Sequence, residues 1–127
     1  MTSLRTFDET RAAAAERLCE LIVPGSSSVG SVVYVDALVS EMPPPVREHA
    51  LASIDALAPA AAEGADALAA HERTPEFAFV RALAIEAYYS DFVAPGAPGP
   101  GAWDEIDFKP PLAARLDKDW SYLGVGA

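Results

Sequence analysis

Apolar residues recur at helical spacing along most of the first 92 residues of the chain. The first stripe consists of Phe7, Ala14, Leu18, Leu21 and Ile22, with Arg11 as its one polar member. Thr6 has Glu9 three positions later, which is the spacing of a capping box. Pro24 and Gly25 are a stop signal, and the three serines that follow (26–28) predict a loop. The pattern therefore predicts a helix from Thr6 to about residue 23.

The next two apolar segments predict helices on either side of a run of three prolines, 43–45. In the segment 31–41, the SVVYV stretch has the β-branched composition of a strand. No second strand-like run exists to pair with it, so a helix is the better prediction. The segment after the prolines predicts a helix up to Pro59, with an apolar face formed by Val46, Ala50, Leu51, Ile54 and Leu57.

Two further helices are predicted before the chain changes character. Residues 60–71 are rich in alanine and form a fourth, short helix that Gly64 weakens. The last helix has the clearest start, because Thr74, Pro75 and Glu76 supply an N-cap, a proline at the first position and an acid in the first turn. Its apolar stripe consists of Phe77, Val80, Leu83, Ala84, Ala87 and Tyr88.

The whole pattern predicts an all-α fold in one domain, because 127 residues have room for a single core. Residues 1–92 are expected to form a small bundle of about four to five helices. Residues 93–127 are expected to form an extended C-terminal arm, which begins with a stretch rich in proline and glycine (93–101).

Most of the aromatic residues lie at the end of the last helix and in this arm. Seven of the eleven follow residue 87, namely Tyr88, Tyr89, Phe92, Trp103, Phe108, Trp120 and Tyr122. Trp and Tyr dominate binding energy when they enter a pocket of a partner. Alternatively, the arm folds back and its rings fill gaps in the bundle, which applies most to Tyr88 and Phe108. The alanine-rich helices offer few deep grooves, which favours a partner surface for the two tryptophans and Tyr122.

Composition and charge exclude several classes of partner. The chain has 19 acidic and 9 basic residues, for a net charge of −10, and such a surface repels phosphate backbones and anionic lipids. No run approaches the roughly 20 apolar residues that cross a bilayer. We expect no nucleic-acid partner, no membrane association and a cytoplasmic location. Much of the 51% hydrophobic fraction is alanine, which predicts a thin core that a partner would stabilise.

No motif in the sequence supports catalysis by this chain alone. Residues 25–30 (GSSSVG) have the outer spacing of a phosphate loop, but Ser31 stands where its lysine is required. Neither His49 nor His71 has further ligands at metal-binding spacing, and the single Cys19 is expected to be a core residue. The prediction is that the chain holds no catalytic residue, no cofactor and no metal.

The residues around the proline- and glycine-rich loop carry a resemblance to a known family. EAYYSD (86–91), the loop, and then Trp103-x-x-Ile106-x-Phe108 resemble the ending of the gluconate 2-dehydrogenase subunit 3 family. LIVPG (21–25) and VVYVD resemble the family's opening, and the stripe from Phe77 to Leu83 resembles its later helix. The sequence departs from the family at Ala87, Ala102 and Asp107, where glycine is usual.

This resemblance implies a non-catalytic small subunit that binds and stabilises an FAD-dependent oxidoreductase of the glucose–methanol–choline class. The partner would hold the FAD and would act on a sugar, a glycoside or another alcohol. Some members of the family carry a twin-arginine export signal, which this sequence does not show, so an intracellular complex is expected. The partner-binding residues implied are Tyr88, Tyr89, Phe92, Trp103, Ile106, Phe108, Trp120 and Tyr122.

Two other functions are kept as alternatives. One is a self-sufficient small enzyme with a pocket under the arm, in which Asp91 or Glu86 acts as a base together with Tyr89. The other is a stand-alone homodimeric binding module. The acids Asp91, Asp104, Glu105 and Asp107 flank the loop and could gather there, although solvated or capping roles are commoner for such residues.

Overall fold

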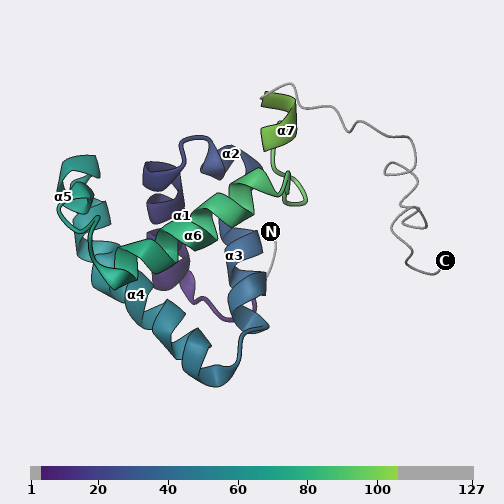
Figure 1. Ribbon diagram of the computed structural model, residues 1–127. Coiled ribbons are helices and arrows are strands. Elements are labelled where there is room, and N and C mark those ends of the chain that lie inside the picture. The colour runs from purple at the N-terminus through teal and green to yellow at the C-terminus, as the bar shows by residue number, and fades with distance from the viewer. Residues whose placement is uncertain (1–3, 106–127) are drawn as a thin grey trace, which may run out of the picture.

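The computed structural model describes residues 4–105, which form helices and connecting loops without any strand. The helices are α1 (Glu9–Ile22), α2 (Ser26–Val29), α3 (Ser31–Ser40), α4 (Pro44–Glu63), α5 (Ala65–Ala69), α6 (Pro75–Tyr89) and α7 (Ala102–Glu105). The long helix α4 packs against both α1 and α6, and α3 packs against α6 and α1 (Figure 1). The predicted all-α bundle is therefore confirmed.

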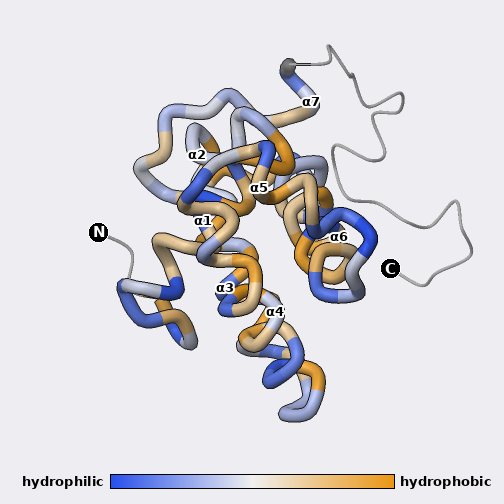
Figure 2. Tube along the Cα trace, turned by 90° about the vertical axis from the view of Figure 1, so that its left-hand side faces the viewer, coloured by the Kyte–Doolittle hydropathy of each residue, from blue (hydrophilic) through white to orange (hydrophobic). Residues whose placement is uncertain are grey.

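The core is made where the four longer helices meet. Its fully buried apolar side chains include Leu18, Val29, Val39, Ile54 and Leu57. Between them lie buried alanines from α1, α4 and α6, which let the helix backbones approach closely. Figure 2 shows hydrophobic and hydrophilic residues alternating along the helices, as expected for helices that each bury one face. Val46, predicted on the buried face of α4, is instead 40% exposed.

The predicted start of the first helix at Thr6 is wrong. The N-cap of α1 is Asp8, whose side chain accepts a hydrogen bond from the backbone N–H of Arg11 at 2.8 Å. Thr6 does not cap α1, because its backbone N–H donates to Asp36 at 2.9 Å and its hydroxyl is hydrogen-bonded to that of Ser40 at 3.1 Å. A contact with a distant helix thus decides where α1 begins.

The serines predicted as a loop form the one-turn helix α2. Gly25 and Gly30 flank it with φ of +102° and +69°, a left-handed backbone that glycine adopts without steric cost. The carboxylate of Glu20 on α1 accepts hydrogen bonds from the backbone N–H groups of Gly25 and Ser27, each at 3.0 Å. These bonds satisfy the start of α2, and they place Val29 in the core.

The predicted end of the third helix at Pro59 is also wrong, because α4 continues through it to Glu63. Proline removes the hydrogen bond to the carbonyl of Asp55, but both residues lie on the exposed side of the helix, where water can replace the lost donor. Gly64 then separates α4 from α5, which covers only the middle of the predicted segment 60–71. The predicted start of α6 is confirmed, since the Thr74 hydroxyl accepts from the N–H of Phe77 at 3.2 Å.

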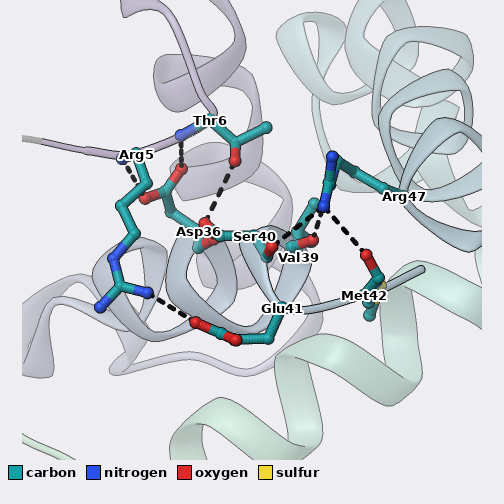
Figure 3. Close-up of polar contacts among 8 residues, drawn as sticks. All are labelled: Arg5, Thr6, Asp36, Val39, Ser40, Glu41, Met42 and Arg47. Atoms are coloured by element: carbon teal, nitrogen blue, oxygen red, sulfur yellow. Dashed lines mark hydrogen bonds and ion pairs between the residues drawn. The ribbon is translucent and has the colours of Figure 1, made fainter. Parts of the chain in front are cut away.

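A buried carboxylate joins the N-terminal segment to α3. Asp36 is 2% exposed and accepts hydrogen bonds from the backbone N–H groups of Arg5 (2.6 Å), Thr6 (2.9 Å) and Phe7 (2.8 Å). Figure 3 shows the first two of these bonds, together with the ion pair between Arg5 and Glu41. Three donors around one carboxylate satisfy a charge that burial would otherwise make costly.

Arg47 on α4 caps the C-terminal end of α3. The guanidinium of Arg47 donates to the carbonyls of Ser40 at 3.1 Å and Met42 at 3.0 Å, and lies 3.4 Å from that of Val39 (Figure 3). Because the last carbonyls of a helix have no partner within it, a cation at this position is favourable both as a donor and for the helix dipole.

We predict that Asp36→Ala lowers the free energy of unfolding by about 3 kcal/mol, because three backbone donors lose their buried acceptor. The measurement is urea denaturation followed by circular dichroism. Asp66→Ala, which removes an exposed carboxylate on α5, is the control and should change the free energy by less than about 0.5 kcal/mol. Equal effects of the two variants would contradict this account of Asp36.

Glu20 should make stability depend on pH. Hydrogen bonds from the backbone N–H groups of Ser27 and Gly25 hold the pKa of Glu20 below the usual value of a glutamate. Its contribution is therefore complete above about pH 4.3, the unfolded value, and is lost as the pH falls through the lower pKa of the folded state. The difference in unfolding free energy between wild type and Glu20→Gln should be largest at neutral pH and should shrink below about pH 4.3. A difference that stays constant down to pH 3 would contradict the assignment.

Candidate functional site

A tight reversal of the chain follows α6 and is centred on Asp91. Asp91 has φ of +65° and is the only non-glycine residue with positive φ within residues 4–105. Its carboxylate accepts a hydrogen bond from the backbone N–H of Trp103 at 3.1 Å. Gly101 lies directly against this carboxylate, and an added Cβ would overlap it. Asp91 thus closes the proline- and glycine-rich loop into a ring between α6 and α7.

The loop lies on α2. The N–H of Ala94 donates to the carbonyl of Val29 at 2.8 Å, and that of Gly99 donates to the carbonyl of Ser28 at 2.9 Å. Ala94 is buried, and Ala102 at the start of α7 is fully buried. Residues 93–102, which were expected to begin an extended arm, therefore pack on the bundle instead.

Two of the eight predicted partner-binding residues pack within the bundle. Tyr88 is 4% exposed and its ring lies beneath Gly25. The ring of Phe92 is half-buried and meets Tyr34 edge-on at 5.4 Å, while the Tyr34 hydroxyl donates to Glu86 at 2.8 Å. Tyr88 and Phe92 therefore join the end of α6 to α2 and α3, as the self-packing alternative expects for Tyr88.

Two others are brought together at the surface. The indole Nε1 of Trp103 donates to the backbone carbonyl of Tyr89 at 3.2 Å, and the ring of Tyr89 meets that of Tyr88 edge-on at 5.1 Å. Tyr89 is 50% exposed and Trp103 is 36% exposed. We call these two side chains the Tyr89/Trp103 patch. With Val93 in the adjoining loop, they make up three of the four large apolar side chains exposed in the described range.

The remaining four predicted residues lie outside the described residues: Ile106, Phe108, Trp120 and Tyr122.

The structure also contains a feature that the sequence did not predict. A groove of about 530 Å³ lies between α5, the end of α1 and the first half of α6. Its only signal in the sequence is that Leu21, Ile22 and Phe77 belong to apolar stripes, and these side chains stay half-buried.

The groups considered for catalysis are engaged in structural contacts. Asp91 holds the backbone of Trp103, and Glu86 accepts from Tyr34. Cys19 is buried, as predicted, and burial, aided by Glu16 and Glu20, raises its pKa to about 12, so its thiol stays protonated at neutral pH. Within the part of the chain that is described, no group of three or more His, Cys, Asp or Glu side chains could hold a metal ion.

The hydropathy of the helices bears on membrane insertion. Of the helices between residues 4 and 105, none combines the length and the apolar character needed to cross a bilayer.

Comparison with known proteins found no matching family model, no matching curated protein and no matching solved structure. The resemblance to the gluconate 2-dehydrogenase subunit 3 family therefore stays a prediction that rests on its motif residues.

We predict that Asp91→Gly loosens Trp103. Glycine adopts the left-handed backbone freely but removes the acceptor for the Trp103 N–H, so quenching of Trp103 fluorescence by acrylamide should increase about twofold. Trp120→Phe in all variants leaves Trp103 as the single tryptophan. Asp91→Asn keeps both an acceptor and a tolerance for positive φ, and should quench like the parent. Quenching that is unchanged in Asp91→Gly would show that the carboxylate does not hold Trp103.

Proposed function

We propose that this chain is a non-catalytic small subunit that binds and stabilises an FAD-dependent oxidoreductase of the glucose–methanol–choline class. The partner would hold the FAD and would oxidise a sugar, a glycoside or another alcohol. The chain itself would supply apolar contact area and no reactive group. A cytoplasmic location is part of the proposal and can be checked by cell fractionation.

The observation that carries the proposal is that the motif residues fix the turn after α6 and leave two aromatic rings exposed beside it. Asp91 and Trp103, two residues on which the resemblance rests, hold the turn after α6 in place, with Gly101 between them. The result is two exposed rings: the Trp103 indole is hydrogen-bonded to the backbone carbonyl of Tyr89, and the Tyr89 ring packs edge-on against Tyr88. A rigid exposed aromatic pair loses little conformational entropy when it docks, which suits an anchor for a protein partner.

The stability of the bundle gives a reason for a partner to be needed. Alanine occupies many of the buried positions, including Ala15, Ala50, Ala60, Ala61 and Ala84. A buried methyl group contributes less than the larger side chains would, at roughly 25 cal/mol for each Å² of apolar surface removed from water. Covering the Tyr89/Trp103 patch would therefore benefit both proteins, because each gains buried apolar area.

We predict that Trp103→Ala weakens binding of the flavoprotein by about 2 kcal/mol, which is about thirtyfold in Kd. The experiment is co-expression with an FAD-dependent oxidoreductase of this class from the same organism, followed by measurement of co-elution, Kd, soluble yield and FAD content. The variant keeps the backbone N–H that Asp91 binds, so its helix content by circular dichroism should not change. Val46→Ala removes an equally exposed apolar side chain from α4 and is the matched control.

The wild-type result decides between this proposal and its main rival. Equal yield and FAD content with and without the chain, and no co-elution, would overturn the subunit function. Should ultracentrifugation then show a dimer of the pure chain that Trp103→Ala dissociates, the patch would serve a homodimeric module instead.

A further inference from the structure

The groove between α1, α5 and α6 is apolar at its floor and charged at its rim. Leu21, Ile22, Leu68 and Phe77 line it, of which Leu68 is buried and the other three are half-buried. It opens broadly to solvent, so a small molecule would leave much of its surface in water, whereas ligand sites usually bury most of theirs. Figure 1 shows α5 and α7 at opposite ends of the bundle, so the groove lies far from the Tyr89/Trp103 patch.

The two arginines on the rim differ from the other four arginines in the described range. Those four are engaged with other residues: Arg5 with Glu41, Arg11 with Asp55, Arg17 with the carbonyl of Ala61, and Arg47 with the last carbonyls of α3. Arg73 and Arg81 have no hydrogen bond or ion pair with any residue from 4 to 105, and both are exposed beside the groove. Glu72 is the one acidic residue in the lining.

This placement is unusual for so acidic a chain. With a net charge of −10, most of the surface would repel an acidic segment of another protein. In the groove, two guanidinium groups that have no partner among residues 4–105 stand beside apolar side chains. Guanidinium stays charged at all physiological pH values and matches a carboxylate with two parallel hydrogen bonds.

We propose that this groove binds a segment of the flavoprotein partner in which a carboxylate is flanked by apolar side chains. This inference rests on the proposed function and adds a second contact to it. The apolar side chains of the segment would cover Leu68 and Phe77, and its Asp or Glu would lie between Arg73 and Arg81. A polypeptide segment fits an open groove because it covers the floor along its length and excludes water from the ion pairs.

Two separated contacts on one partner have a specific consequence. Once the Tyr89/Trp103 patch is docked, the groove meets its segment at a high effective concentration, so even a weak second contact raises the overall affinity. The groove contact is electrostatic in part, and salt weakens it more than it weakens the apolar patch.

The first test is the affinity of the flavoprotein for the double variant Arg73→Gln/Arg81→Gln. Kd should rise at least tenfold at low salt, and the dependence of Kd on salt should become shallower. Since neither arginine has a partner among the described residues, the fold should be unaffected, as circular dichroism can confirm. Arg5→Gln, which removes an exposed arginine from another part of the molecule, is the matched control and should bind like wild type.

The second test uses the low reactivity of the native thiol. Ala69 is exposed and lines the groove, so Ala69→Cys introduces a thiol there, while Cys19 is buried and does not compete for a maleimide. Bound flavoprotein should slow alkylation at this position at least fivefold. Ala52→Cys introduces an exposed thiol on α4 outside the groove, and its rate should not change.

The outcomes separate the two proposals. If wild type does not bind the flavoprotein, both the subunit function and the groove contact are overturned. If wild type binds and Trp103→Ala weakens binding, the subunit function stands. In that case, wild-type affinity in the arginine double variant, or an unprotected thiol in Ala69→Cys, overturns the groove contact alone.

Discussion

Buried alanines on α1, α4 and α6 let these helices pack closely and leave little depth between them for larger side chains. Most of the aromatic rings in residues 4–105 lie towards the ends of the bundle, although Phe7 and Tyr88 are themselves buried in the core. Tyr34, Tyr88, Tyr89, Phe92 and Trp103 gather where α6 ends, and Phe77 lies near its start, beside the groove. Both candidate contact surfaces contain rings that remain partly exposed, namely Tyr89 and Trp103 in the patch and Phe77 in the groove.

Hydrogen bonds from backbone N–H groups to carboxylates fix the N-terminal segment and the starts of two short helices. Asp36 fixes the N-terminal segment on α3, Glu20 fixes the start of α2, and Asp91 fixes the start of α7. Each of the three is a carboxylate that accepts backbone N–H groups. An acidic composition thus has a structural use in this chain, besides keeping the surface charged.

The longer helices could be predicted because their apolar stripes and caps are local signals, as Thr74 and Pro75 show for α6. The errors at Thr6 and at the serines of α2 arose from bonds to Asp36 and Glu20, which lie on other elements. For the site, the sequence selected Tyr88, Tyr89 and Trp103 together and named Tyr88 as the ring most suited to self-packing. Only the structure shows that Tyr88 is buried, with its ring against Gly25. The groove could not be predicted, since three separate helices form it.

Gly30 lies where the loop after α6 packs against the end of α2. An added Cβ at Gly30 would stand 2.6 Å from the Cβ of Ala94. The backbone N–H of Ala94 donates a hydrogen bond to the carbonyl of Val29, the residue before Gly30. Any side chain at this junction would push the loop off α2, and with it the backbone that leads to Trp103. A substitution at Gly30 would therefore change how the Tyr89/Trp103 patch is presented to solvent without altering either of its residues.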